Sequence, residues 1–485
     1  MQNSQEKIKN PLYDNTIPLV VDLDGTLIYT DLLHEGIVLL LKKNFLYIFL
    51  LIPWLLKGKV YLKNKIFQTV QINPELLPYN TELLEFLKKE SDSGRPIVLA
   101  TASPILNAIE ISKIHPLFDS VYGTDNKTNL KGKNKSTVLT NLFGKGKFDY
   151  IGNSFSDLEI FSSVRYSYLV NAPIFLEKRV KRISNLQFAW NSRKDAFQYL
   201  LKSIRPHQWV KNLLVFVPLI TAHKLNSIGL ITLTFCSFIA FNLVASSGYL
   251  INDLSDLNSD RSHPRKRFRP LASGKVSILS GSILALILFG IGMYLASKIN
   301  ALFLLTLVCY FITSLLYSLY FKKVLLYDVF ILALLYSIRV FAGGAVIDVK
   351  LSFWLIAFST FIFLSLAFVK RYSELMQVNT KGGLKSRGRD YLTEDIHLLQ
   401  VMGIASGFSS VIVFSLYINS PEVALLYSKP DFLWSISLLF LFWISRIWFI
   451  TIRGEMTDDP IIFAIKDLTS YVLFALVGLI LFFSI

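Results

Sequence analysis

The chain has 485 residues, of which 53% are hydrophobic, a formal net charge of +16 and a mean hydropathy of +0.48. This apolar balance excludes an ordinary soluble enzyme and is typical of a membrane protein with several spans. On such a protein an excess of Lys and Arg indicates cytoplasmic loops and contacts with anionic head groups or phosphates, and no basic module with stacking aromatics predicts nucleic-acid binding.

The first 195 residues predict a soluble α/β domain. Short β-rich runs lie at Ile17–Val21, Ile97–Ala100 and Phe148–Ile151, and helical patterns separate them. Each run ends in small or acidic residues. This order favours a parallel sheet that carries functional loops at the carboxyl ends of its strands.

Residues 36–56 are apolar and nearly long enough to span a membrane. Lys42 and Lys43 interrupt the run, and Pro53 lies near its end. A span here would also separate strands that build one site. We therefore expect a helical cap, at about residues 30–90, that lies on the membrane interface or packs against the membrane half.

Two carboxylates, Asp22 and Asp24, follow the first predicted strand in the motif DLDGT. Side chains two residues apart project toward the same side and leave room for a cation. One carboxylate can attack phosphorus and form an aspartyl-phosphate, and the other can protonate the leaving group. Gly25 permits the tight turn.

This motif resembles the first motif of the haloacid-dehalogenase (HAD) superfamily, and three further motifs follow in the family's order. They are IVLAT at 97–101, LKGKNK at 130–135 and GNSFSD at 152–157. The resemblance implies Asp22 as nucleophile, Asp24 as general acid/base, and Thr101 and Lys135 as phosphate binders, with Lys133 as the alternative lysine. It implies Mg²⁺ held by Asp22, Asp24, Asn153 and Asp157. Many relatives have Asp at the position of Asn153, which leaves open a docking or regulatory module without catalysis.

From about residue 196 to 485 the chain predicts an all-α domain with about nine transmembrane helices. The apolar segments lie at 211–223, 228–251, 277–298, 301–321, 325–346, 352–369, 396–419, 432–452 and 461–484. Lys and Arg gather in the loops after the second, fourth and sixth segments, which places these loops in the cytoplasm. The same rule predicts a multi-pass protein of the cell (inner) membrane with a cytoplasmic N-terminal domain.

The segment 252–260, NDLSDLNSD, directly follows the second apolar span. Continued as a helix, it places Asp253, Asp256 and Asp260 on one face. Clustered carboxylates are costly near a bilayer and suit Mg²⁺, which also binds substrate phosphates. The segment therefore predicts a Mg²⁺–diphosphate site at the membrane surface.

A second acidic position, Asp328, begins the fifth span, and Arg339 lies inside the same span. The charge rules place Asp328 on the same membrane side as the Asp-rich segment. A donor rich in phosphate needs many cations. The candidates are Lys211, Arg265, Lys266, Arg267, Lys322 and Arg339. The basic run at 265–267 is equally expected from the topology rule, whereas an arginine inside a span favours function or internal pairing.

This half resembles the UbiA-type intramembrane prenyltransferases, whose NDxxDxxxD pattern is matched by Asn252, Asp253, Asp256 and Asp260. Most members carry a second DxxxD motif, but here Leu332 stands four residues after Asp328. The branch that matches further is that of decaprenyl-phosphate phosphoribosyltransferases. Its matching residues are RPHQWVKN at 205–212, HPRKRFRP at 263–270, Tyr317, Ser318, Lys322, Asp328, Arg339, AGG at 342–344 and KRYSE at 370–374.

The resemblance implies a bifunctional enzyme. The membrane half would transfer 5-phosphoribosyl from 5-phosphoribosyl diphosphate (PRPP) to a polyprenyl phosphate, with Mg²⁺, and Asn252, Tyr317 and Asp328 would help to bind substrate. The HAD-like half would remove the 5-phosphate, giving a lipid-linked ribose for glycan or cell-wall assembly. The alternative is an aromatic prenyltransferase of quinone-type biosynthesis with a regulatory or inactive HAD-like domain.

Overall fold

The computed structural model describes residues 16–125, 128–190, 195–380, 382–385, 389–456 and 459–484. The chain forms two compact units. The first comprises the described residues up to 203 together with 253–283, and the second comprises 204–252 and 284 onward. The Asp-rich segment, which belongs to the predicted membrane domain by sequence position, therefore packs with the N-terminal unit.

The N-terminal unit is built on a six-stranded parallel sheet with strand order β3-β2-β1-β4-β5-β6. The strands are β1 (Leu19–Val21), β2 (Ile97–Pro104), β3 (Ser120–Thr124), β4 (Asp149–Gly152), β5 (Ser167–Val170) and β6 (Leu186–Trp190). The helices that connect them are α4 (Thr81–Asp92), α5 (Ile105–Ile114), α6 (Lys133–Phe143), η3 (Phe155–Asp157), α7 (Leu158–Phe161) and α8 (Ile174–Ile183). The predicted α/β fold with a parallel sheet is confirmed.

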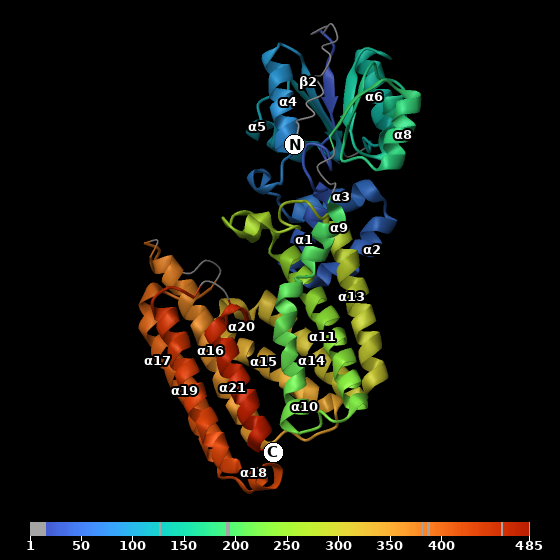
Figure 1. The fold of residues 1–485 in the computed structure, drawn as a ribbon. Helices are drawn as coiled ribbons and strands as arrows, with labels where there is room; N and C mark the ends of the chain where they lie inside the picture. The colour runs from blue at the N-terminus through green and yellow to red at the C-terminus, as the bar shows by residue number, and fades with distance from the viewer. Residues whose placement is uncertain are drawn as a thin grey trace, which may run out of the picture. The chain divides into compact units, whose positions relative to one another are not determined.

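The sheet is buried on both faces, as a parallel sheet with helical connections should be. Leu19 and Val21 of β1 pack into a cluster with α4 and α5, whereas Val20 packs into a second cluster with α6 and α8. Figure 1 shows α4 and α5 on one side of the sheet and α6 and α8 on the other. The alternation along three residues of one strand thus builds both halves of the core.

The cap follows β1 as predicted. It consists of α1 (Leu32–Lys43), η1 (Phe45–Tyr47), α2 (Ile48–Leu56), α3 (Lys59–Thr69) and η2 (Pro74–Leu76). The apolar stretch Phe45–Leu56 is too short to span a membrane. Its large apolar side chains are exposed, with Phe49 70% and Leu56 83% accessible. This exposed apolar surface suits an element that lies on a membrane interface.

Four more segments complete the first unit or join it to the second. They are α9 (Ala196–Ser203), α12 (Leu257–Arg261), η5 (Lys266–Phe268) and the first turns of α13 (Ile278–Ile299).

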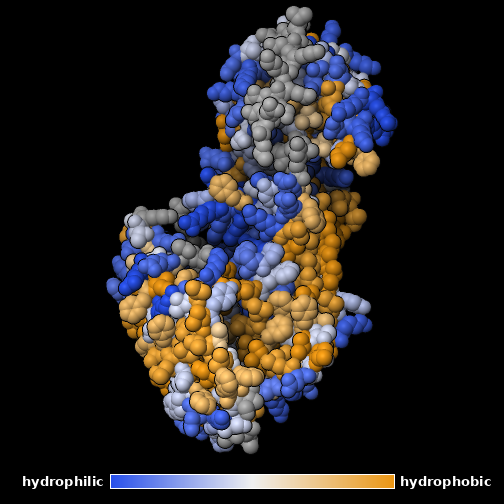
Figure 2. Space-filling model, in the orientation of Figure 1, coloured by the Kyte–Doolittle hydropathy of each residue, from blue (hydrophilic) through white to orange (hydrophobic). Residues whose placement is uncertain are grey.

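The second unit is all-helical. Its elements are η4 (Pro206–Phe216), α10 (Val217–Thr221), α11 (Ile228–Ser255), α13, α14 (Ala301–Leu319), η6 (Phe321–Lys323), α15 (Tyr327–Val346), α16 (Phe353–Asn379), η7 (Thr393–Asp395), α17 (Ile396–Ile418), α18 (Pro421–Leu426), η8 (Pro430–Phe432), α19 (Leu433–Ile452), α20 (Pro460–Lys466) and α21 (Leu468–Ser484). Hydrophobic side chains cover the visible flank of these helices, and hydrophilic residues gather at the helix ends (Figure 2).

Among the described residues, seven helices are long and apolar enough to cross a membrane, and an eighth arises if α20 and α21, bent by 84°, form one broken span. The expected first span, 211–223, is instead the end of the 3₁₀ helix η4 followed by the short helix α10. Pro218 at the start of α10 prevents one continuous helix. At the usual rises, η4 and α10 together are about 30 Å long, which equals the thickness of a bilayer's hydrocarbon core.

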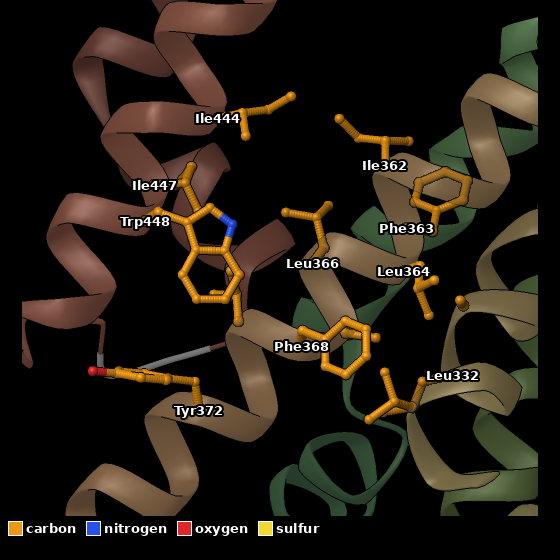
Figure 3. Packing of buried hydrophobic residues seen from close by; sticks show 14 of the residues in the cluster. Leu332, Ile362, Phe363, Leu364, Leu366, Phe368, Tyr372, Ile444, Ile447 and Trp448 are labelled. Carbon is orange, nitrogen blue, oxygen red and sulfur yellow. The ribbon is translucent and has the colours of Figure 1, made fainter. Parts of the chain in front are cut away.

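The core of the second unit lies where α15, α16, α17 and α19 meet. Figure 3 shows Ile444, Ile447 and Trp448 of α19 facing Leu366 and Phe368 of α16. This crossing requires Gly403 of α17, because a Cβ there would lie 2.2 Å from the Trp448 ring. Small residues at such crossings let membrane helices approach closely.

Candidate active sites

The HAD-like motifs converge because their strands are neighbours. Val21 of β1 pairs with Leu99 of β2 and with Ile151 of β4, so the carboxyl ends of the three strands meet at one edge. Asp22 is buried there, and its Oδ1 accepts a hydrogen bond from Lys135 Nζ at 2.6 Å. Lys135 Nζ also donates to Tyr150 Oη at 2.9 Å. Lys133, the alternative lysine, is exposed at the start of α6.

Asp24 is oriented by three hydrogen bonds. Its Oδ1 accepts from the Leu32 amide at 2.9 Å, and its Oδ2 accepts from Ser103 Oγ at 2.7 Å and from Thr101 Oγ1 at 3.3 Å. Burial, with the nearby charges of Asp31 and Asp22, raises the pKa of Asp24 to about 7. A carboxyl group with such a pKa holds a proton near neutral pH, as a general acid must.

The acidic fourth motif lies on the loop after β4. Asp157 is buried, and its Oδ2 accepts from the Ser154 amide at 3.1 Å. Burial and the charge of Asp22 raise the pKa of Asp157 to about 6. Asn153 lies directly over Gly25: a Cβ at Gly25 would meet Asn153 Nδ2 at 2.0 Å, so this turn accepts only glycine.

Two residues of this site were not predicted from the sequence. Ser103 lies two residues beyond Thr101 on β2, and the alternation of a strand would have pointed to it. Lys63 reaches the site from cap helix α3 and donates to the Ala102 carbonyl at 2.5 Å. Burial lowers its pKa, and the charge of Asp24 opposes that shift. No local pattern distinguishes Lys63 from the other lysines of the cap.

The donors of this site are carboxylate and amide oxygens, which are the ligands that Mg²⁺ prefers. Burial and the charge of Asp22 raise the pKa of Asp157, and a divalent cation would offset both, so the residues fit such an ion. Within the described residues, no group of three or more His, Cys, Asp or Glu side chains is already arranged as a metal centre.

The Asp-rich segment is not one continuous helix. Helix α11 ends at Ser255, and α12 begins after Asp256, whose φ and ψ of −100° and 11° leave the helical range. The expected single helical face is therefore broken. Asp253 and Asp260 still meet, because Arg269 Nη1 lies 3.0 Å from Asp253 Oδ1 and 2.6 Å from Asp260 Oδ2. Asp256 is only partly buried.

Arg269 stands where a cation belongs between two carboxylates. The pair is buried, and burial raises the pKa of Asp260 while Arg269 opposes the shift. Two carboxylates share the guanidinium of Arg269 within this cluster. Its oxygen donors fit Mg²⁺.

A second arginine ties this segment to the cap within the first unit. Arg261 Nη2 and Nη1 bind Glu35 Oε1 and Oε2 of α1 at 2.6 and 3.1 Å, and Thr30 Oγ1 donates to Glu35 Oε1 at 2.7 Å. Gly274, with φ of +72°, packs so closely that a Cβ would lie 2.4 Å from Tyr29 Cβ. The residues that follow the Asp-rich segment are therefore in direct contact with the residues that follow Asp22 and Asp24.

The basic residues between positions 261 and 269 fall into an inward-facing group and an exposed group. Arg261 and Arg269 face inward, whereas Arg265, Lys266 and Arg267 are exposed. The guanidinium of Arg267 lies 4.9 Å from the centre of the Phe268 ring. The outward side chains suit contact with a mobile anion or with lipid head groups.

In the second unit Asp328 is fully buried and neutralised. Its Oδ2 lies 2.8 Å from Arg371 Nε and 3.3 Å from Arg389 Nη1, and its Oδ1 accepts from Tyr391 Oη at 2.5 Å. Arg389 also donates to Tyr317 Oη at 3.5 Å. The structure thus joins the predicted residues Tyr317 and Asp328. The two arginines are also paired with Glu374, so this cluster is balanced in charge.

Lys211 and Arg339 belong to another buried cluster. Arg339 Nε donates to Asn212 Oδ1 at 2.7 Å and Nη2 donates to Tyr310 Oη at 3.1 Å. Lys211 Nζ binds Asp459 Oδ2 at 2.6 Å. Asp459 was not predicted, because an aspartate before a proline at a helix start reads as an ordinary N-cap. The remaining predicted residues, Asn252 on α11 and Lys322 on η6, are partly buried.

Comparison with known proteins gives one family match, two relatives and one solved structure. A family model described as UbiA prenyltransferase family matches residues 213–465. The uncharacterized protein y4nM of Sinorhizobium fredii (strain NBRC 101917 / NGR234) is 32% identical over 98% of this chain and 93% of its own length. Its match therefore includes both units.

The decaprenyl-phosphate phosphoribosyltransferase of Mycolicibacterium smegmatis is 29% identical over 60% of this chain and 95% of its own length. Among solved structures, a UbiA homolog from Archaeoglobus fulgidus bound to GPP and Mg²⁺ is 17% identical. It covers 58% of this chain and 99% of its own, with a TM-score of 0.46.

Proposed function

This chain belongs to the UbiA prenyltransferase family, and from that premise we propose that its membrane unit transfers 5-phosphoribosyl from PRPP to a polyprenyl phosphate. The observation that carries the choice of substrates is the buried excess of positive charge around Lys211 and Arg339. PRPP carries a phosphomonoester in addition to its diphosphate, and the polyprenyl phosphate carries a phosphomonoester as well. The similarity to a phosphoribosyltransferase over nearly that protein's whole length supports the same choice.

Asp253 and Asp260, with Asp256 and Asn252 beside them, would supply oxygen ligands to Mg²⁺, and the donor would bind there by its diphosphate. Mg²⁺, when bound there, neutralises the leaving diphosphate. Exposed Arg265, Lys266 and Arg267, with Lys322, bind donor phosphates. As the C1–oxygen bond of the donor breaks, its electron pair leaves with the diphosphate. The lipid phosphate oxygen then bonds to C1. Tyr317 and Asp328 shape the site through their arginine partners.

The HAD-like unit removes the 5-phosphate of the product. An Asp22 oxygen attacks phosphorus, the bond from phosphorus to O5 breaks, and O5 takes the proton of Asp24. Water then attacks the aspartyl-phosphate, Asp24 regains a proton, and inorganic phosphate leaves. Thr101 and Lys135 hold the phosphoryl oxygens, and Asp157 and Asn153 complete an oxygen donor set for Mg²⁺.

The chain is a multi-pass membrane protein, and we place its HAD-like unit and basic loops in the cytoplasm of the cell that makes it. The Lys and Arg distribution supports this orientation. A crossing by η4 and α10, about 30 Å in length, puts the N-terminal unit on the same side as the loop after α11.

The test is mass spectrometry of lipid products. Detergent-purified protein is incubated with PRPP, a polyprenyl phosphate and Mg²⁺, beside an Asp22→Asn variant. We expect ribosyl lipid from the parent and phosphoribosyl lipid from the variant. Phosphoribosyl lipid from both would remove the phosphatase assignment. No product from either, with prenylation of a hydroxybenzoate-type acceptor, would replace the proposal with the aromatic prenyltransferase.

A further inference from the structure

The carboxylate of Asp459 lies at the centre of a buried cationic cluster within the second unit. Lys211 Nζ lies 2.6 Å and Lys370 Nζ 3.3 Å from Asp459 Oδ2, and Tyr336 Oη lies 3.2 Å from the same oxygen. The side chains of Lys211 and Asp459 are 8% and 7% exposed. These contacts, two ammonium groups and a phenol on one oxygen, are those that a phosphate oxygen would make.

The charges of this cluster do not balance. Arg339 lies next to it, with its guanidinium 5.4 Å from the centre of the Tyr336 ring. Its hydrogen bonds go to Asn212, Tyr310 and a backbone carbonyl, and no described carboxylate pairs with it. Among the described residues, three cations therefore face one carboxylate, which leaves two positive charges in a largely buried place. An uncompensated buried charge is expensive and marks a functional site.

The backbone that carries Lys211 is unusual in the same place. Helix η4 keeps 3₁₀ geometry for 11 residues, from Pro206 to Phe216, whereas such runs rarely exceed three or four. It begins after Arg205, whose φ of +56° is left-handed. Gly343 of α15 lets η4 approach, because a Cβ there would lie 2.1 Å from the Val215 carbonyl oxygen. Packing thus holds Lys211 and Asn212 in an unfavourable local geometry.

Asp459 also makes a hydrogen bond that does not involve the lysines. It is the N-cap of α20, and its Oδ1 accepts from the Ile461 amide at 3.3 Å. Helices α20 and α21 meet at the 84° bend, so α20 is a short separate element. A small rotation of the carboxylate away from the lysines keeps its position at the helix N-terminus, where a negative charge is favourable.

We propose that Lys211, Lys370 and Tyr336 form a binding site for a phosphate monoester, and that Asp459 occupies this site until the phosphate displaces it. The inference rests on the proposed function, whose two substrates both carry such a group, and it adds the residues and the displacement. A phosphate monoester carries up to two negative charges. If a doubly charged phosphate replaces the singly charged carboxylate of Asp459, the excess positive charge of the cluster falls from two to one.

The experiment measures binding without turnover. Full-length protein carrying Asp22→Asn, in detergent and without Mg²⁺, is titrated with ribose 5-phosphate or with farnesyl phosphate by calorimetry. The first probe has only the donor's monoester, and the second has only the acceptor's. Asp459→Asn keeps the shape of the side chain and removes the charge. Lys211→Gln and Lys370→Gln remove the ammonium groups, and Lys323→Gln, at an exposed lysine of η6, is the matched control.

We expect Asp459→Asn to tighten the binding of at least one probe about tenfold, because a charge-assisted competitor is lost. Lys211→Gln and Lys370→Gln should weaken that probe about tenfold or more, and Lys323→Gln should not. Tightening of ribose 5-phosphate alone assigns the site to the donor, tightening of farnesyl phosphate alone assigns it to the acceptor, and tightening of both gives a site that takes either monoester. A gain in affinity cannot come from misfolding.

Weaker binding of both probes by Asp459→Asn, or unchanged binding in all variants, would overturn the proposal. Failure of the lipid-product assay would not, because the titration requires no transfer. Conversely, the protein could form ribosyl lipid while Asp459→Asn leaves the binding of both probes unchanged. That result would support the proposed reaction and contradict the proposed binding site.

Discussion

The two polar sites that are richest in charge differ in sign. In the HAD-like unit, the carboxylates Asp22, Asp24 and Asp157 lie near Lys135 and the cap residue Lys63. Burial raises the pKa values of Asp24 and Asp157. In the membrane unit, Lys211, Lys370 and Arg339 surround Asp459, the one carboxylate that the described residues place there. Carboxylates outnumber cations at the first site, and cations outnumber the described carboxylate at the second.

This difference indicates what each site binds. A carboxylate excess with oxygen donors suits a divalent cation, and a buried cation excess suits phosphate. The Asp328 cluster is a third case, because Arg371 and Arg389 match Asp328 and Glu374. A balanced cluster needs no ligand, so it supports the architecture of the site.

The largest expected effect is a loss of phosphate hydrolysis in the first unit without a loss of transfer in the second. Asp22→Asn removes the nucleophile of the first site and should lower hydrolysis of ribose 5-phosphate on the order of 10⁶-fold, as loss of a catalytic nucleophile does in other enzymes. Transfer by the membrane unit should continue. The measurement is release of inorganic phosphate, with Asp92→Asn, on the exposed end of α4, as control. Hydrolysis that survives the substitution would contradict the assignment of the first site.

We expect the charge-balanced Glu35–Arg261 pair to contribute to stability and not to ligand binding. Glu35→Gln leaves a buried arginine with half its partners, which typically costs about 3–5 kcal/mol. Thermal unfolding should show the loss. The control is Glu177→Gln, which breaks the exposed Lys181–Glu177 pair at a cost of about 0.5 kcal/mol or less. Equal losses in both variants would show that the contact between cap and Asp-rich segment is unimportant.

Gly343→Ala tests whether packing positions the basic cluster. The added methyl group meets the Val215 carbonyl and Pro218, so η4 must move away from α15. Overpacking of this kind costs about 1–3 kcal/mol. We expect a lower melting temperature together with a higher KM for PRPP or the lipid phosphate, depending on which one Lys211 binds. Gly290→Ala, where nothing lies within 4 Å of the new Cβ, is the matched control and should change neither.

Sequence patterns predicted the parallel sheet and the cap, and the strand ends bring DLDGT, Thr101 and Asp157 to one edge regardless of distant packing. Sequence patterns did not predict the features that depend on tertiary contacts. Nothing local indicates that η4 is a 3₁₀ helix, that Asp256 interrupts the acidic helix, or that Arg269 joins Asp253 to Asp260. Asp459 was missed because its partners lie 89 and 248 residues away in the chain.

The smallest effect is a pH dependence confined to the first site. The raised pKa of Asp24, about 7, means that its carboxyl is protonated below neutral pH and can protonate a departing alkoxide. Hydrolysis of ribose 5-phosphate should therefore fall about tenfold per pH unit above 7. The same shift means that the folded state holds this proton more tightly than the unfolded state, so stability also falls as pH rises from about 4 to 7, and Asp24→Asn should remove that loss. The control is p-nitrophenyl phosphate, whose leaving group departs without a proton and whose hydrolysis should lack the steep limb. An identical limb for both substrates would show that the titrating group acts on another step, and that Asp24 does not serve as the acid.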